Sequence, residues 1–418
     1  MIYKTNLITN NKIEKTVNFL TYDYPFIGND IYFIEPEVEN LSKIFRKVNI
    51  IPLKKNDKIS NKFLNYDNIN FDYRLSKINI YYVFFEIIKS FFSLTLWIEI
   101  FKIRRKFLLK KIRMIFSEYV NSKIIEHFIR KNYDLNNEIF YSFWSNCTLI
   151  SLQKLNVKNS FSRSLGSDLN GFVAEDDFVP FIRNKFNNLN FLLILNDGQK
   201  KLLRNKNLII KNKIHKCYMG TEIQNHYNVG NSKKEITFLS CGSLIDIKNP
   251  LFIANFINKF SDFYKNIKIN YISIGTGHLE SKFKEKFIKK KSNLKFTLIP
   301  KVNNIFNFIK KNRIDYFINF SFSEGLSFAN MEVMSVGIPV ICSNIYGNTE
   351  IVNKANGFIH NSNEDLNFSK ISKSILNNHL NIKKKNKKRN LAQLTILKKF
   401  DLKICQGDFN KIIYRYYI

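Results

Sequence analysis

The second half of the chain alternates short apolar segments with longer amphipathic segments, and this pattern constrains the fold more than any other feature. The predicted strands of this half are residues 236–241, 271–274, 294–299, 316–320 and 339–342. The segments between them have helical length and spacing, as at residues 250–260. Short apolar strands that alternate with helices indicate a parallel sheet covered on both faces, with ligands at the carboxyl ends of its strands.

The first half has the same character with less regularity. Its predicted strands are residues 17–22, 48–53, 138–143, 160–162 and 189–195, with a helix at 33–45 and a long helical insertion near 80–130. The chain has 418 residues, enough for two domains that each bury a core. We therefore predict an α/β protein of two Rossmann-like domains facing a central cleft. The expected domains are residues 1–230 and 231–395, followed by a C-terminal helix at 396–418 that could pack back on the first domain.

One stretch, SEGLSFANMEVMSVGIPVICSN at residues 323–344, places two carboxylates around a predicted helix start. Glu324 lies in the turn after a strand, and Glu332 lies inside the helix, which begins near Ser327 and ends at Gly337. Eight helical residues span about 12 Å, and free backbone N–H groups at a helix N-terminus bind anions. Carboxylates for hydroxyl groups on either side of an anion site describe a nucleotide-sugar pocket. From this spacing alone, a solvent-facing Glu332 and a turn-capping Glu324 remain an equal alternative.

The longer segment FINFSFSEGLSFANMEVMSVGIPVICSNIYGNTEIV (317–352) resembles the donor-binding motif of the retaining glycosyltransferases of the glycosyl transferases group 1 family. Two further segments of the second half are similar to the family's glycine turns, FLSCGSLIDIKNP (238–250) and ISIGTGHLESKFK (272–284). Weaker similarity covers FLTYDYPFIGNDIYFIEPEVENLSKIF (19–45) and SRSLGSDL (162–169). The resemblance implies the GT-B fold, with the first domain for the acceptor and the second for the nucleotide-sugar donor.

The resemblance also implies roles for individual residues. Glu324 and Lys248 would be catalytic, Glu324 by contacting hydroxyl groups of the donor sugar and Lys248 by neutralising the diphosphate. Glu332 would hold the ribose. The remaining donor-binding residues would be Gly242, Ser243, Gly325, Leu326, Ser327, Phe328 and, from the first domain, Gly28. On the acceptor side the matching positions are Arg163 and Asp168.

The activity implied is transfer of a hexose-type sugar, with retention, from a UDP- or GDP-sugar to a glycan or lipid-linked acceptor. Cell-surface polysaccharide or lipopolysaccharide biosynthesis is the expected setting, and neither a cofactor nor a metal is expected. Two positions depart from the family pattern, since Ser243 replaces an arginine and Leu165 replaces a histidine. A GT-B scaffold subunit that has lost catalysis therefore remains an alternative.

The chain carries 66 Lys and Arg residues against 34 Asp and Glu residues, a formal net charge of +32. An excess of this size attracts anionic partners such as nucleic acid, phosphorylated substrates or a membrane surface. The charge is spread over the chain without a zinc finger, helix-turn-helix or RNP-like motif, so we predict no specific nucleic-acid binding. A basic nucleic-acid-binding protein stays the less favoured alternative. The run KKKNKKRN at 383–390 is predicted to be a solvated connection into the last helix.

Cysteine usage and the N-terminal residues predict a cytoplasmic protein. The five cysteines are widely separated, none forms a CxxC pair, and histidine is scarce, so neither a disulfide framework nor a zinc site is expected. The first residues are polar and lack the apolar core of a signal peptide. The apolar stretch at 80–101 contains Glu86, Lys89 and Glu99, which makes it a poor membrane span.

The same stretch is followed by a dense basic segment. Residues 102–113 contain seven basic side chains and no acid, namely Lys102, Arg104, Arg105, Lys106, Lys110, Lys111 and Arg113. An apolar helix beside a basic face suits the surface of an anionic bilayer, where each cation contributes roughly 1 kcal/mol. We therefore predict peripheral attachment to the inner face of the cell membrane. The alternative is a helix packed on the core, because Trp97, Phe101, Leu108, Ile112, Ile115 and Tyr119 recur at helical spacing.

Overall fold

The structure of the protein is a computed structural model that describes residues 12–27, 31–56, 58–103, 107–170, 178–208, 213–225, 232–361 and 368–418. The chain forms two compact units. The first unit comprises Met1–Leu195, Gln199–Cys217 and Gln406–Ile418, and the second comprises Asn196–Gly198 and Tyr218–Cys405.

The first unit is built on a seven-stranded sheet with the order β3-β2-β1-β4-β5-β6-β7, in which every pairing is parallel. The order reverses between β1 and β4, as it does in Rossmann folds. The strands are β1 (Ile13–Thr21), β2 (Phe45–Pro52), β3 (Ile69–Phe71), β4 (Ile139–Phe143), β5 (Ser160–Arg163), β6 (Phe191–Ile194) and β7 (Ile214–Lys216). The central strands are buried along almost their whole length, as expected when helices cover both faces of a sheet.

The helices of the first unit come from both ends of the chain. They are α1 (Ile31–Ile44), α2 (Ile80–Phe91), α3 (Leu94–Phe101), α4 (Leu108–Asn132), α5 (Cys147–Lys154), α6 (Ser167–Asn170), α7 (Asp197–Asn205) and α15 (Leu402–Tyr417). From Gln406 onward α15 belongs to this unit, where the side-chain amides of Asn410 and Asn40 hydrogen bond each other at 2.7 and 3.2 Å.

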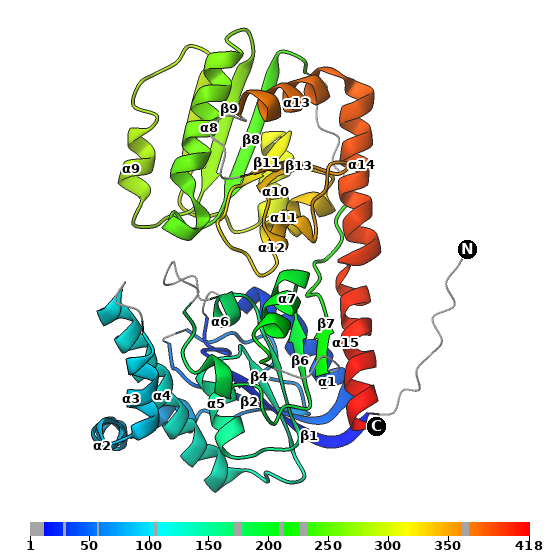
Figure 1. Ribbon diagram of the computed structural model, residues 1–418. Coiled ribbons are helices and arrows are strands. Elements are labelled where there is room, and N and C mark those ends of the chain that lie inside the picture. Colours follow the sequence, from blue (N-terminus) through cyan, green and yellow to red (C-terminus); the bar gives the residue numbers. More distant parts are fainter. Residues whose placement is uncertain are drawn as a thin grey trace. The chain divides into compact units, whose positions relative to one another are not determined.

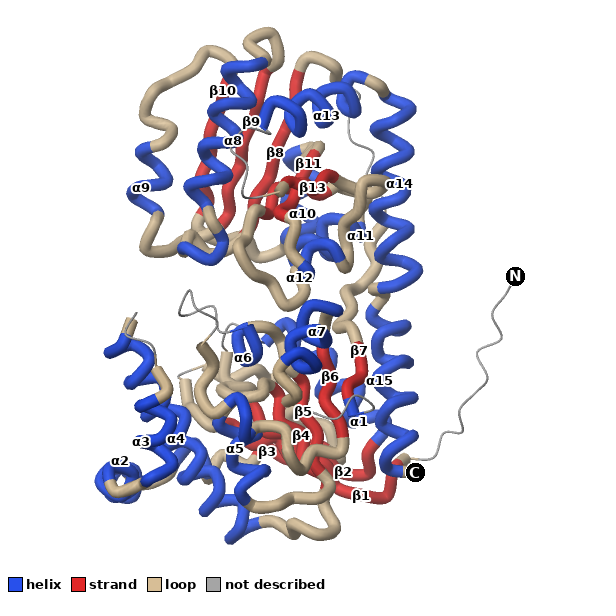
Figure 2. Tube along the Cα trace, viewed as in Figure 1, coloured by secondary structure: helices blue, strands red, loops and turns tan. Residues whose placement is uncertain are grey.

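The second unit repeats the plan with a six-stranded parallel sheet in the order β10-β9-β8-β11-β12-β13. Its strands are β8 (Glu235–Cys241), β9 (Lys268–Ile274), β10 (Leu294–Ile299), β11 (Tyr316–Asn319), β12 (Val340–Ser343) and β13 (Phe358–His360). Its helices are α8 (Pro250–Phe263), α9 (Glu280–Glu285), α10 (Ile305–Asn312), α11 (Phe328–Ser335), α12 (Tyr346–Thr349), α13 (Phe368–Leu380) and α14 (Ile382–Lys399). In each unit the strands gather into one sheet flanked by helices, as Figures 1 and 2 show. The predicted α/β class with two Rossmann-like halves is confirmed.

The prediction of a solvated connection at residues 383–390 is wrong in part, because this basic run forms the first half of α14, although most of its side chains are exposed. Its buried face carries two of the cations, Lys385 and Arg389, followed by Ala392 and Ile396 at helical spacing. Lys385 Nζ lies 2.6 Å from Oδ1 of Asp315, which precedes β11, and both side chains are buried. Lys385 therefore joins the helix to the sheet.

The prediction that one apolar stripe runs from Trp97 to Tyr119 as core is also wrong in part. Ile115 and Tyr119 are buried in α4, whereas Trp97, Phe101 and Leu108 are exposed. The helical period does not continue across the stripe, because α3 ends at Phe101 and α4 begins at Leu108 as a separate helix.

Candidate active site

The motif with the two glutamates follows the carboxyl end of β11. Ser327 caps α11, with its side chain accepting a hydrogen bond from the backbone N–H of Asn330. Gly337 has φ 81° after the helix, and its N–H donates to the carbonyl of Met334 at 2.9 Å. As predicted, Glu324 therefore lies in the turn before the helix and Glu332 lies inside it.

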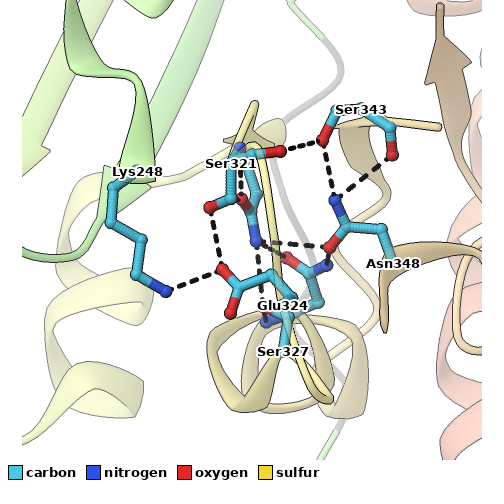
Figure 3. Close-up of polar contacts among 8 residues, drawn as sticks. Lys248, Ser321, Glu324, Ser327, Ser343 and Asn348 are labelled. Atoms are coloured by element: carbon cyan, nitrogen blue, oxygen red, sulfur yellow. Dashed lines mark hydrogen bonds and ion pairs between the residues drawn. The ribbon is translucent and has the colours of Figure 1, made fainter. Parts of the chain in front are cut away.

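Glu324 contacts Lys248, although 76 positions separate them in the chain. The Lys248 ammonium, from the short helical turn after β8, lies 2.7 Å from Oε1 of Glu324 (Figure 3). The hydroxyl of Ser321 lies 2.8 Å from the same oxygen. The structure thus brings together the two residues assigned to catalysis, and it fixes the carboxylate from two directions.

A buried network of amides and hydroxyls holds this turn in place, and the sequence analysis did not identify it. Nδ2 of Asn319, the last residue of β11, donates to Ser327 Oγ at 2.9 Å and to Asn330 Oδ1 at 3.2 Å. Asn330 in turn donates to Oδ1 of Asn348 at 3.0 Å. Asparagine has a low propensity for strands and for helix interiors, so its presence at the end of β11 and inside α11 was the feature of the sequence that could have indicated this network. Asparagine is so frequent in this chain that the signal did not stand out.

The network continues to the neighbouring strand and helix (Figure 3). Asn348 in α12 donates to the backbone carbonyl and hydroxyl of Ser343 at 3.2 and 3.1 Å, and the Ser343 hydroxyl donates to the carbonyl of Ser321 at 2.6 Å. A Cβ added to Gly347 would lie 2.3 Å from the carbonyl oxygen of Glu324. Helix α12 can approach the Glu324 turn this closely only because position 347 is glycine.

The glycine turns after β8 and β9 pack against each other by their backbones. The N–H of Gly242 donates to the carbonyl of Ile274 at 2.9 Å, and a Cβ on Gly275 would lie 2.0 Å from the carbonyl oxygen of Gly242. On the other side of this turn a Cβ on Gly242 itself would meet open space, and Ser243 is exposed. The turn therefore presents accessible backbone beside Lys248, as a phosphate-binding turn requires.

Glu332 is the second acid of the site, and its carboxyl is shielded from water. Burial raises the pKa of Glu332 from its ordinary value of 4.5 to about 7. The thiol of Cys241, at the end of β8, has a pKa of about 11, raised by burial and then by the charge of Glu332, while Lys248 acts in the opposite direction. Glu332 and Lys248 thus both act on the Cys241 thiol at the carboxyl end of β8.

The other predicted donor-binding residues lie along the same turn. The carbonyl of Gly325 accepts a hydrogen bond from the side-chain amide of Asn196 at 2.6 Å, Leu326 is buried, and Phe328 begins α11. Gly28 lies outside the described residues. Across the described ranges, no three His, Cys, Asp or Glu side chains come together in a way that could hold a metal ion.

The two residues predicted for the acceptor side are buried in the first unit. The Arg163 guanidinium lies 3.1 Å from Glu37 and donates to the carbonyl of Cys217 at 2.9 Å. Asp168 accepts hydrogen bonds from three backbone N–H groups, those of Ser145, Leu165 and Gly166. Both side chains thus have structural partners, and their geometry gives no support to acceptor contact.

Comparison with known proteins assigns the second unit to a family. Residues 222–393 match the model described as Glycosyl transferases group 1. The chain carries a glycosyl transferases group 1 domain. The family predicted from the sequence is therefore confirmed, and the matched range contains Lys248, Glu324 and Glu332. No curated protein matches the chain significantly.

Solved structures match the glycosyl transferases group 1 domain together with the first unit, so the GT-B fold is confirmed. The structure of TarM matches with a TM-score of 0.67 at 11% identity, and the match covers 96% of this chain and 98% of the TarM chain. The apo form of the lipopolysaccharide outer core galactosyltransferase WaaB matches with a TM-score of 0.65 at 13% identity, and the match covers 96% of this chain and 99% of the WaaB chain. The structure of Anabaena HepE in complex with UDP and glucose matches with a TM-score of 0.65 at 9% identity, and the match covers 96% of this chain and 100% of the HepE chain.

Proposed function

We propose that the chain is a retaining glycosyltransferase that moves a hexose-type sugar from a nucleotide-sugar donor to a glycan or lipid-linked acceptor. The observation that carries the proposal is the convergence of Lys248, Glu324 and Glu332 around the glycine turn of β8 and the N-terminus of α11. Two carboxylates, one ammonium and a helix N-terminus provide separate partners for hydroxyl groups and for a diphosphate.

The role proposed for each side chain follows from the charges that develop on the substrate during the reaction. Breaking the bond between the sugar and the diphosphate leaves negative charge on the leaving phosphate and positive charge on the sugar ring. Lys248 and the N–H groups at the start of α11 would stabilise the phosphate, because positive groups fixed in advance act where charge develops. Glu324 would orient the sugar through its hydroxyl groups, and Glu332 would accept hydrogen bonds from the ribose.

A uridine nucleotide is the first donor to examine, with a guanosine nucleotide as the alternative. UDP is the nucleotide in the structure of HepE and in one structure of TarM. The expected setting is cell-surface polysaccharide or lipopolysaccharide assembly, because a lipopolysaccharide galactosyltransferase has the same fold. A lipid-linked acceptor would be met at the inner face of the membrane, by a cytoplasmic protein attached peripherally to an anionic surface. Neither a cofactor nor a metal is part of the proposed reaction.

The test is calorimetric titration with UDP and GDP, followed by turnover of the corresponding sugar nucleotides. Glu332→Ala should weaken nucleotide binding as well as turnover, because ribose hydrogen bonds exist in the ground state. Glu324→Gln should lower turnover more than nucleotide affinity, since its partner is the sugar. The matched control is Glu285→Gln, an exposed change in the same unit that should alter neither quantity. Wild-type affinity for both nucleotides in the Glu332→Ala protein would contradict the assignment.

The same measurements separate the enzyme from a scaffold that has lost catalysis. The exposed Ser243 stands where the family has an arginine, so the site has one cation fewer beside the diphosphate. A catalytic protein binds the nucleotide and turns over the donor. A scaffold subunit would bind the nucleotide without turnover.

A further inference from the structure

The exposed apolar side chains of the described residues are concentrated in one segment of the first unit. Fourteen of the twenty-nine large apolar side chains that are exposed lie between Ile80 and Leu109, in and next to α2 and α3. Phe92 is 86% exposed, and Phe101 is 83% exposed. We call the exposed apolar side chains of residues 80–101 the α2–α3 surface. Contiguous apolar patches of this kind mark an interaction site.

Helix α2 carries apolar side chains on both its inner and its outer side, because Val83 and Ile87 pack against the core of the first unit. Glu86 and Ser90 are buried, whereas Tyr81, Phe84 and Phe85 on the other side are exposed. Between α2 and α4 lies a cavity of about 290 Å³ lined mostly by polar and charged side chains. A helix that only covers a core has polar and charged side chains on its outer side. The outward apolar side of α2 therefore needs another apolar medium.

Helix α3 continues the α2–α3 surface, and the N–H group of its tryptophan already has a hydrogen-bond partner within the protein. The indole Nε1–H of Trp97 donates to the carbonyl of Phe91 at 2.6 Å, so the ring can enter an apolar medium with its donor satisfied. The acid of α3 is turned inward, because Glu99 accepts the backbone N–H of Phe181 at 2.7 Å. Leu94 and Phe101 are among the most exposed side chains.

Cations lie around this surface and reach solvent. Lys89, Lys102, Lys110 and Arg113 are exposed, while the two acids of residues 80–113, Glu86 and Glu99, lie mostly buried. Lys111 was predicted to join the basic face, and that prediction is wrong. Its side chain is fully buried, with Nζ 5.6 Å from the ring centre of Phe178. Residues 104–106 lie outside the described ranges.

We propose that the α2–α3 surface inserts into the interfacial layer of an anionic lipid bilayer, with the surrounding cations on the headgroups. Aromatic side chains and cations at one level are the pattern of a helix lying in the membrane interface. Within the part of the chain that the structure describes, no helix is long and apolar enough to cross a bilayer. A second copy of the chain is a poorer occupant, because a symmetric pairing would bring the same cations face to face. The proposal rests on the proposed function to the extent that a lipid-linked acceptor gives the attachment its purpose.

The test is flotation with vesicles of phosphatidylcholine, with and without phosphatidylglycerol. Wild type should float with the anionic vesicles, and Trp97 emission should shift to shorter wavelength. The variant Phe84→Ser, Phe92→Ser, Phe101→Ser should lose at least tenfold in vesicle affinity, including the part that persists at high salt. The variant Lys89→Gln, Lys102→Gln, Lys110→Gln should lose affinity mainly at low salt, about fivefold for each cation. A double change of exposed apolar residues in the second unit, Phe263→Ser with Ile288→Ser, is the matched control and should bind like wild type.

Two results would overturn the proposal. One is equal vesicle binding by wild type and by the serine variant of the α2–α3 surface. The other is a wild-type dimer in light scattering that becomes monomeric in the serine variant while neither protein binds vesicles, which would assign the surface to a second copy. UDP affinity is measured on each protein without vesicles. Flotation by a wild type that binds no nucleotide would leave this proposal standing and remove the proposed function.

Discussion

At the scale of single residues, the binding role proposed for Glu332 falls on a carboxyl group whose burial disfavours a charge. Because its folded-state pKa of about 7 exceeds its ordinary value of 4.5, the folded protein holds this proton more tightly than the unfolded chain does. The resulting contribution to stability is complete below pH 4.5 and is lost as the pH rises through 7. At pH 8 the site therefore keeps a carboxylate that the fold disfavours.

We expect Glu332→Gln to raise the free energy of unfolding at pH 8 by roughly 1–3 kcal/mol, because the amide has no charge to bury. The same change should weaken UDP binding, and it should remove the part of the pH dependence of UDP affinity between pH 6 and 8 that comes from Glu332. Chemical denaturation at pH 5 and pH 8 measures the first effect, and calorimetry measures the second. A stability difference between the two proteins that stays constant from pH 5 to pH 8 would contradict the burial of this charge.

Ser243 carries the second prediction at this scale. Its position beside an accessible glycine turn leaves space for a longer side chain, so Ser243→Arg should tighten binding of the nucleoside diphosphate. A charge-assisted hydrogen bond to phosphate is worth about 1–3 kcal/mol, or roughly 5- to 150-fold in affinity. Ser243→Gln is the uncharged control for side-chain length. Equal or weaker binding by the arginine variant would mean that another cation already serves the diphosphate.

At the scale of elements, α14 is joined to the sheet of the second unit by a buried ion pair. Asp315 accepts Lys385 on Oδ1 and the backbone N–H of Thr237, at the start of the neighbouring strand, on Oδ2 at 2.9 Å. Removing one partner of a buried pair leaves an uncompensated charge. Lys385→Met should therefore lower the free energy of unfolding by about 3–5 kcal/mol. Lys384→Met, an exposed change one residue earlier, should change it by less than about 0.5 kcal/mol, and similar losses in both variants would contradict the role of Lys385.

The same elements show how far the sequence could predict this structure. The strand, turn and helix around Glu324 were predictable, because Ser327, Gly337 and Pro339 mark the helix ends by local chemistry. The role of Lys385 was not predictable from charge density, since only its register on α14 and the distant Asp315 decide that it is buried. The asparagine network depends likewise on three segments that meet only in the folded chain.

At the scale of the whole molecule, the net charge of +32 predicts binding to polyanions of every kind. We expect duplex DNA to bind without sequence preference, with affinity falling about 10³-fold or more between roughly 50 and 200 mM salt. Fluorescence anisotropy with two unrelated duplexes measures both properties. A preference for one duplex that survives at 200 mM salt would favour the nucleic-acid-binding alternative.

The overall architecture was predictable because each half repeats one local unit, a buried strand followed by a helix. The exposure of α2 was less accessible to prediction. Apolar side chains lie on both sides of α2, so the sequence alone does not tell the inner Val83, which packs on the core, from the outer Phe84, which is exposed.

The contact between Lys248 and Glu324 also bears on the entropy of ligand binding. A lysine side chain carries roughly 2 kcal/mol of rotamer entropy, part of which is lost when a ligand orders it. In the structure the Lys248 ammonium is held 2.7 Å from a carboxylate oxygen of Glu324. A diphosphate bound as proposed would therefore meet a cation whose side chain is already ordered by Glu324. In the Glu324→Gln protein a similar nucleotide affinity would arise from a more favourable enthalpy and a larger loss of side-chain freedom.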